Sequence, residues 1–228
     1  MRFQKIFTLL VLFISCSHTV SASLQPGDLL ISEVMSNPDA VSDTNGEWFE
    51  IFNASAGTHD LNGLVISDNG SNSHTVNNAT SLFINPGDYF ILGRNADNLN
   101  NGGLTLDYMY SNFTLSNSMD QIILLFDSIE IARLEYNGAP FGIAGVSAEI
   151  TAQKSVTTQA DYQATEIIQY GDGDFGTPGS AGSFQLASGA SPVPLPGAVW
   201  LFASAAMIGI RAVKFRGSAY QTVSPVFK

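Results

Sequence analysis

Acidic side chains gather in two short stretches of this 228-residue sequence, and their types suit a calcium ion. Carboxylate and amide oxygens carried on loops are the ligands that Ca²⁺ prefers. Neither stretch follows the EF-hand pattern, so ordinary solvated acidic loops remain the alternative. Calcium is the only cofactor that the sequence suggests, as a speculative site. Its candidate ligands are Asp39, Asp43 and Glu47, with Asn45 beside them, and Asp172 and Asp174.

The histidines offer little for catalysis. A hydrolase needs a nucleophile, a base and a group that orients the base. Between residues 23 and 190 only His59 and His74 could serve as bases, and no G-x-S-x-G elbow accompanies them. A zinc site is not indicated, because the sequence has no cysteine after Cys16 and no H-x-x-x-H spacing. We therefore expect a protein that is not an enzyme, with a calcium-dependent enzyme or an accessory domain of a secreted hydrolase as the alternative.

Glu50 is a separate candidate because of its place in an apolar run. Strand alternation puts Glu50 on the same face as Trp48 and Phe52. A carboxylate among aromatic side chains must be hydrogen-bonded or partly solvated. We expect Glu50 to accept backbone N–H groups from a nearby turn, and a ligand site is the alternative.

The charge balance excludes one class of partner. Of nine Lys and Arg residues, two lie in residues 1–22 and four in residues 211–228, which leaves three against all twenty Asp and Glu residues and a net charge of −17. Such a surface repels phosphate groups, so we expect no nucleic-acid binding. It suits solubility, divalent cations or basic partners.

The elements that must carry these side chains read as short strands. Apolar runs broken by Asn, Gly, Asp and Pro predict one all-β domain, an antiparallel sandwich or barrel. Asp127-Ser128 separates two runs and predicts a hairpin turn, whereas Asn45-Gly46 is one of several further turn signals. The predicted strands are 29–35, 48–52, 61–66, 89–92, 121–126 and 129–136.

The N-terminus has the order of a secretory signal peptide. Arg2 and Lys5 precede the apolar run 6–14, and Val20-Ser21-Ala22 offers small residues for cleavage. The run is too short for a membrane span, which needs about 20 residues. A lipidated Cys16, in a loose lipobox, is a second interpretation.

The C-terminus predicts a membrane anchor. Residues 197–213 are largely apolar, and Arg211, Lys214 and Arg216 form a basic flank that the positive-inside rule places in the cytoplasm. An amphipathic or core helix is the alternative.

The ordered motifs of the middle region resemble a lamin-tail domain over roughly residues 28–183. The resemblance implies an immunoglobulin-like β-sandwich of the kind found on secreted or surface proteins of bacteria. The motifs that carry it are LISEVM at 30–35, GEWFEIFN at 46–53, DLNGLVISD at 60–68, INPGDYFILG at 84–93, LSNSMDQI at 115–122 and GDFGTPG at 173–179.

The tail resembles a PEP-CTERM sorting signal of the VPLPA type. That resemblance implies recognition by an exosortase-type sorting enzyme and delivery to the envelope or extracellular matrix of a bacterium, near exopolysaccharide or surface proteins. The chain departs from the family by continuing to Lys228, so retention of the tail stays open beside cleavage. The residues that match the motif are Val193, Pro194, Leu195, Pro196, Trp200 and Arg211.

These features predict an exported, non-catalytic surface or matrix module with an adhesion or structural role. The expected fold is an immunoglobulin-like antiparallel β-sandwich between an N-terminal signal helix and one C-terminal transmembrane helix, which contacts the membrane. The expected segments are a signal peptide at 1–22, the sandwich at 23–184, a linker with the sorting motif at 185–196, the transmembrane helix at 197–213 and a basic cytoplasmic tail at 214–228.

Overall fold

The computed structural model describes residues 23–152, 154, 156–165 and 167–183. The predicted signal peptide, linker, transmembrane helix and tail lie outside these residues. Contacts divide the chain into one unit that ends at Ser188 and another that begins at Gly189. Within the described part, no helix is long and apolar enough to cross a membrane.

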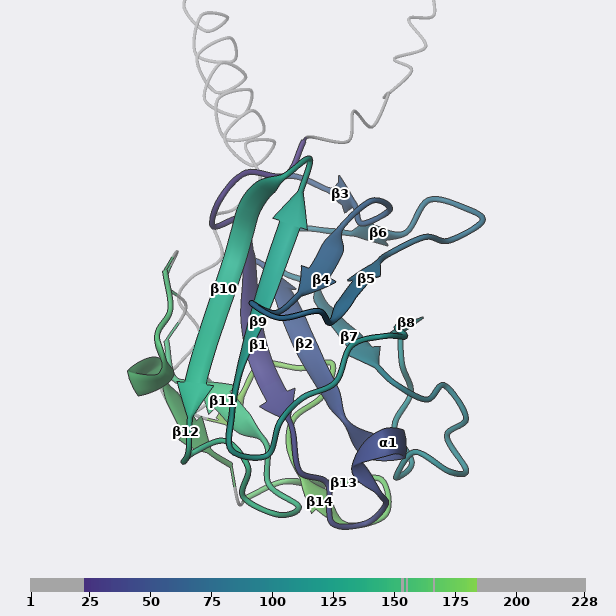
Figure 1. Cartoon of the computed structure of the whole chain (residues 1–228), viewed down its shortest axis with the longest axis vertical. Coiled ribbons are helices and arrows are strands. Elements are labelled where there is room, and N and C mark those ends of the chain that lie inside the picture. Colours follow the sequence, from purple (N-terminus) through teal and green to yellow (C-terminus); the bar gives the residue numbers. More distant parts are fainter. Residues whose placement is uncertain (1–22, 153, 155, 166, 184–228) are drawn as a thin grey trace, which may run out of the picture. The chain divides into compact units, whose positions relative to one another are not determined.

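The described residues form an all-β domain of two main sheets (Figure 1). The larger sheet has the order β12-β11-β1-β2-β7-β8, and the second has the order β10-β9-β4-β5. Their strands are β1 Leu29–Met35, β2 Trp48–Asn53, β4 Val65–Ser67, β5 Ser73–Thr75, β7 Tyr89–Gly93, β8 Tyr108–Met109, β9 Met119–Phe126, β10 Ile129–Asn137, β11 Ala148–Ile150 and β12 Tyr162–Ala164. The remaining elements are β3 His59–Asp60 paired with β6 Phe83–Ile84, β13 Gln169–Tyr170 paired with β14 Asp174–Phe175, the four-residue helix α1 Asp43–Gly46 and the 3₁₀ turn η1 Gln159–Asp161.

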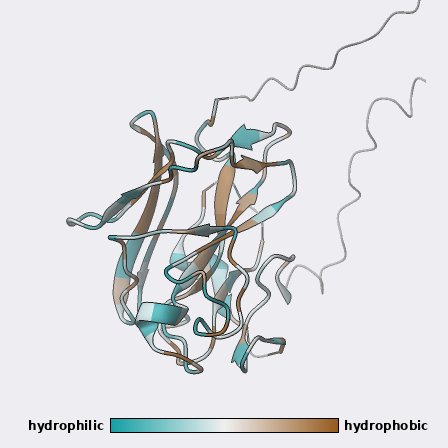
Figure 2. Cartoon of the chain, turned by 90° about the vertical axis from the view of Figure 1, so that its right-hand side faces the viewer, coloured by the Kyte–Doolittle hydropathy of each residue, from teal (hydrophilic) through white to brown (hydrophobic). Residues whose placement is uncertain are grey.

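Apolar side chains from the two main sheets share one core, which makes the domain a sandwich. Leu29 and Ile31 of β1 pack in the same cluster as Ile122 and Leu124 of β9. Figure 2 shows the apolar colouring concentrated on the strands and the polar colouring on the connecting loops. Burial of apolar surface, which contributes about 25 cal/mol per Å², drives the two sheets together.

The larger sheet also has a smaller core on its outer face. Met35, Trp48, Ile91 and Leu104 form this second cluster. A bulge between Ile31 and Glu33 shifts the alternation of β1, so both Glu33 and Met35 reach this outer face. The larger sheet is therefore covered on both faces, and buried polar side chains on its outer face need partners.

The hairpin predicted around Asp127-Ser128 is confirmed. β9 and β10 pair antiparallel with Phe126 opposite Ile129. Asp127 and Ser128 have φ values of 48° and 65°, as a type I′ turn requires at both central positions.

Two local predictions were wrong. Of the run predicted at 61–66, only Val65 and Ile66 lie in a strand, β4, because Gly63 with φ of 93° turns the chain before it. The Asn45-Gly46 turn signal lies inside α1, which Ser42 starts by accepting the N–H groups of Asn45 and Gly46.

Candidate functional site

Three buried glutamates lie side by side across three neighbouring strands. Glu33 of β1 is the cross-strand partner of Glu149 of β11 and of Glu50 of β2. Each is at most 1% exposed. We call Glu149, Glu33 and Glu50 the glutamate row. Adjacent carboxylates in a buried sheet repel one another, so this arrangement needs donors or protons to stabilise it.

The donors come from the last described stretch of the chain, residues 176–183, which we call the closing segment. Thr177 donates its backbone N–H to Glu33 Oε1 at 2.9 Å, and Gly179 donates its N–H to Glu50 Oε2 at 2.6 Å. Ser183 donates both its N–H and its hydroxyl to Glu149 Oε2, at 2.7 and 2.8 Å. Each glutamate of the row therefore accepts a backbone N–H from a different residue of the closing segment.

Hydroxyls from the sheet complete the row. Ser147 donates to Glu33 Oε1 at 2.5 Å, and Ser32 donates to Glu50 Oε1 at 2.6 Å. The expectation that Glu50 accepts a backbone N–H from a turn is thus met by Gly179, whose φ of 79° belongs to that turn.

The hydroxyl of Thr177 fixes a proton in the row. Its Oγ1 lies 3.0 Å from Glu33 Oε2 and 2.9 Å from Glu149 Oε1. A hydroxyl carries one hydrogen, so it donates to one carboxyl and must accept from the other. One of these two glutamates is therefore protonated when both contacts are made.

The pKa values of Glu33 and Glu50 agree with protonation of these two carboxyl groups. Burial raises the pKa of Glu33 to about 7, against the hydrogen bonds from Ser147 and Thr177 that lower it. Burial, reinforced by the neighbouring charge of Glu33, raises the pKa of Glu50 to about 8. Desolvation of a carboxylate favours its neutral form, so Glu33 and Glu50 hold protons near neutral pH.

A glycine allows the closing segment to approach the row. A Cβ at Gly176 would lie 2.6 Å from Glu33 Oε1 and 3.1 Å from Ser147 Oγ. A Cβ at Gly182 would lie 2.9 Å from Glu149 Oε2. The close approach of backbone to carboxyl thus explains the glycines at positions 176 and 182 of the closing segment.

The two predicted acidic loops meet in space. Asp174 Oδ1 accepts the backbone N–H groups of Asp39 and Ala40, at 3.2 and 3.0 Å. Asp43 accepts the side-chain amide of Asn117 at 2.9 Å, and the backbone N–H of Asp172 donates to Gly102 O at 2.9 Å. The described residues contain no group of three or more His, Cys, Asp or Glu side chains that could hold a metal ion. The calcium site stays a prediction.

Glu47 follows the first acidic loop directly, at the end of α1, and its carboxyl makes a different contact. Its Oε2 accepts the Arg94 guanidinium and the Leu115 N–H, each at 3.1 Å. Burial raises the pKa of Glu47 to about 7, against these two contacts, which lower it. This carboxyl therefore links β2 to the segments around Arg94 and Leu115.

His59 contacts a serine and an aspartate, but not in the geometry of a triad. Ser55 Oγ lies 2.8 Å and Asp28 Oδ2 lies 3.6 Å from the same atom, His59 Nε2. In a triad the serine and the acid contact opposite ring nitrogens. Ser55 also donates to Asn53 Oδ1 at 2.8 Å, and His59 is 1% exposed, so the cluster fixes a loop.

His74 connects the edges of the two main sheets. Its Nδ1 accepts the N–H of Ser111 at 3.2 Å, so Nε2 carries the hydrogen that Tyr108 Oη accepts at 3.0 Å. Burial lowers the pKa of His74, which keeps the ring neutral. Its Nδ1 is occupied by a backbone donor and cannot also act as a free base toward Ser111.

Sequence reasoning identified one member of the glutamate row and missed two. Glu50 stood out because it shares an alternating face with aromatic residues. Glu33 was hidden by the β1 bulge, which changes its face, and Glu149 lies in a three-residue strand. The alternation of Val146, Ala148 and Ile150 was the available signal for β11 and its buried glutamate.

Comparison with known proteins gives one family. The Lamin Tail Domain family model matches residues 22–138, which is more than half of the chain. No curated protein and no solved structure matches. The matched residues run from the start of the described domain to the end of β10, so they include Glu33 and Glu50, whereas Glu149 and the closing segment follow them.

Proposed function

Because the chain belongs to the lamin tail domain family, an immunoglobulin-like and generally non-catalytic family, we propose that it is an exported surface or matrix module with an adhesion or structural role. The order of charge, apolar run and small residues in 1–22 supports export. The PEP-CTERM-like residues 193–211 support delivery to the bacterial envelope or matrix by an exosortase-type enzyme.

The observation that carries this proposal is the attachment of the closing segment. Three glutamates on three sheet strands hold residues 177, 179 and 183, directly before the chain continues toward its tail. A domain held by its C-terminal tail experiences any pull at this point. Several buried hydrogen bonds hold that attachment, each with a net contribution of about 0.5–1.5 kcal/mol.

The buried polar groups support a non-catalytic role. In the described part, the glutamate row, Glu47, His59 and His74 each engage backbone groups or neighbouring side chains of the domain. A hydrolysis assay of the purified protein with esters, phosphates and glycans tests this. We expect no turnover above that of a heat-unfolded sample, and saturable hydrolysis of any substrate would overturn the proposal.

A calcium-dependent accessory role is the second candidate. The contact of Asp174 with Asp39 and Ala40 favours it, because it brings both predicted acidic loops together. Calorimetric titration with Ca²⁺, compared with the Asp174→Asn variant, tests this role. Heat of binding in the parent and its loss in the variant would favour it; no heat and no shift in melting temperature would remove it.

A further inference from the structure

β10 is the outermost strand of its sheet, and a groove runs beside it. The groove has a volume of about 470 Å³. β10 forms one wall, β1 contributes to the floor, and the stretch 156–159 forms the opposite wall. Ligand grooves in proteins have volumes of about 300–1,000 Å³, so this one is large enough for several residues of a peptide.

Two contacts already imitate a strand at the ends of this edge. Gly27 donates its N–H to Ile131 O at 2.9 Å. At the other end, the Gln159 side-chain amide accepts from Asn137 N at 2.9 Å and donates to Asn137 O at 3.1 Å. These contacts show that the N–H and C=O groups of every second β10 residue point away from β9.

Arg133 and Glu135 have the same orientation, because antiparallel pairing alternates without a shift from Ala132 to Asn137. Within the described residues, the outward N–H and C=O groups of Arg133 and Glu135 make no backbone hydrogen bond. Four backbone groups in the middle of the groove, two N–H and two C=O, are thus available. An exposed row of such groups is a template for an added strand.

The side chains around the groove select the charge of an added strand. Glu130 and Arg133 neutralise each other, since Arg133 Nε donates to both Glu130 carboxylate oxygens and Nη2 donates to Oε2. Glu135 is exposed and makes no ion pair within the described residues, and the single Arg133 charge stands near both Glu130 and Glu135. The excess charge at the edge is therefore negative.

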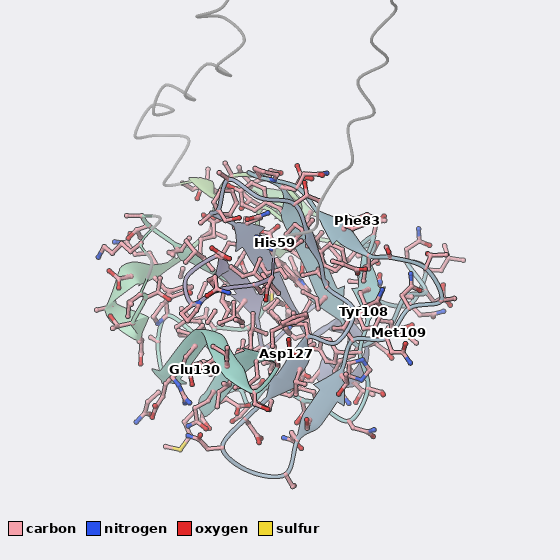
Figure 3. All side chains as sticks on the ribbon, turned by 90° about the horizontal axis from the view of Figure 1, so that it is seen from above. His59, Phe83, Tyr108, Met109, Asp127 and Glu130 are labelled. Atoms are coloured by element: carbon pink, nitrogen blue, oxygen red, sulfur yellow. The ribbon has the colours of Figure 1, made fainter. Side chains whose placement is uncertain are left out.

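Apolar residues also line the groove, together with the polar Thr157, Thr158 and Gln159. Leu29 and Leu30 form part of the floor, and Val156 on the facing wall is 77% exposed. A strand that pairs with β10 would direct alternate side chains to Glu135 and to these apolar residues. Figure 3 labels Glu130 at the start of this edge, beside Asp127 of the hairpin turn.

We propose that the β10 groove binds an extended peptide segment in which basic and apolar residues alternate, by addition of that segment as a strand to the edge of the sheet. The bonds of Gly27 to Ile131 and of Gln159 to Asn137 limit the open part of this edge to the few residues between them, which is the length of a short peptide strand and not of the edge of a second sandwich. The proposal goes beyond the proposed surface role and does not depend on the signal peptide or the tail.

The test measures binding of a fluorescein-labelled peptide to the full-length chain in detergent, by fluorescence anisotropy. The probe is a pentapeptide that alternates Lys and Val. Two matched peptides replace Lys by Glu, or carry N-methyl groups on the residues whose N–H groups would face β10. We expect saturable binding of the first peptide and at least tenfold weaker binding of both others, because each removes charge or backbone complementarity.

Two protein variants locate the site. Glu135→Gln removes the charge and is expected to weaken binding about two- to fivefold, as for an exposed ion pair. Glu135→Pro also removes an outward N–H without breaking the pairs to β9, and is expected to weaken binding at least tenfold. Asp97→Asn, an exposed acid on a distant loop, is the control and should leave binding unchanged.

Hydrogen–deuterium exchange supplies a readout that does not depend on the proline variant folding. Bound peptide should slow exchange of the amides of Arg133 and Glu135 and leave β5 unaffected. Absence of saturable binding up to about 1 mM peptide, which corresponds to a binding free energy weaker than about −4 kcal/mol, would overturn the proposal. Equal binding of the N-methylated peptide would overturn it too, as would slowed amide exchange only at residues outside β10. A concentration-dependent dimer that Glu135→Pro abolishes would also overturn it, in favour of a second copy as the occupant.

Discussion

At the scale of single residues, two buried hydroxyl groups differ in their hydrogen bonds. Thr177 Oγ1 stands between two carboxyls and can donate to only one of them. Tyr110 Oη, in contrast, is buried and has no hydrogen-bond partner within the described residues. Both situations have measurable consequences for the free energy of unfolding.

Thr177→Val should lower the free energy of unfolding by about 1–3 kcal/mol, because Glu33 and Glu149 lose the hydroxyl that bridges them. Thr177→Ser keeps the hydroxyl and is the matched control. Chemical denaturation at pH 6 measures both variants. Equal stability of the valine and serine variants would show that the bridge contributes nothing.

Two tyrosines provide a second matched pair. Tyr136 donates its hydroxyl to Ser116 O at 2.7 Å, so Tyr136→Phe should lower the free energy of unfolding by about 1 kcal/mol. Tyr110→Phe removes a hydroxyl that is buried without a partner, and should leave stability unchanged or raise it. If thermal denaturation ranked the two variants in the reverse order, the assignment of these hydroxyls would be wrong.

At the scale of elements, the closing segment completes the outer face of the larger sheet. It covers polar side chains that β1, β2 and β11 carry, next to the apolar cluster around Trp48. Trp48 Nε1 donates to Tyr170 Oη at 2.8 Å, so β13 is tied to the same face. The segments after β12 therefore act as a cover for this face.

The approach of this cover depends on Gly176. Gly176→Ala should lower the free energy of unfolding by about 1–3 kcal/mol, since the new Cβ would overlap Glu33 Oε1 at 2.6 Å. Gly70→Ala, where the nearest atom is an exposed Asp68 oxygen at 3.2 Å, is the control. Thermal melting of both variants checks this, and equal losses would contradict a specific contact at the row.

At the scale of the whole molecule, the raised pKa values make stability depend on pH. Glu33 and Glu50 have pKa values of about 7 and about 8 in the folded domain, against 4.5 for an ordinary glutamate. The folded state therefore binds more protons than the unfolded state between about pH 4.5 and pH 8, and the free energy of unfolding must fall as pH rises through this window.

We expect the free energy of unfolding to be a few kcal/mol lower at pH 8 than at pH 5.5, because each unit by which a pKa is raised corresponds to about 1.4 kcal/mol. His74, whose pKa is lowered, opposes this trend below about pH 6.5. Glu50→Gln should flatten the profile, whereas the exposed Glu130→Gln should not. Urea denaturation across this range provides the profile, and a rise toward pH 8 would contradict protonation of the row.

How much of this could be predicted from the sequence depends on the range of the interactions. β1 was predicted with its full bounds, and β2, β7, β9 and β10 within two residues, because each has a clear apolar pattern. β11 to β14 were missed, since strands of two or three residues carry almost no pattern.

The site followed the same division. Glu50 could be predicted from its own strand as a carboxyl group that accepts a backbone N–H from a turn. Its neighbours Glu33 and Glu149 could not, because a bulge and a pairing over 100 residues apart bring them together. The proximity of Asp174 to Asp39 is likewise a tertiary contact with no local signal.

The central claim, an exported surface module, is tested most directly by the intact mass of the protein from its native host, with peptide mapping of both ends. The account predicts a chain that begins at Ser23 and is recovered from envelope or matrix material. An end near Pro194-Leu195-Pro196 would identify a sorted product, and a retained Trp200 a membrane-anchored one. A chain that still begins at Met1 and is recovered from the cell interior would contradict the account.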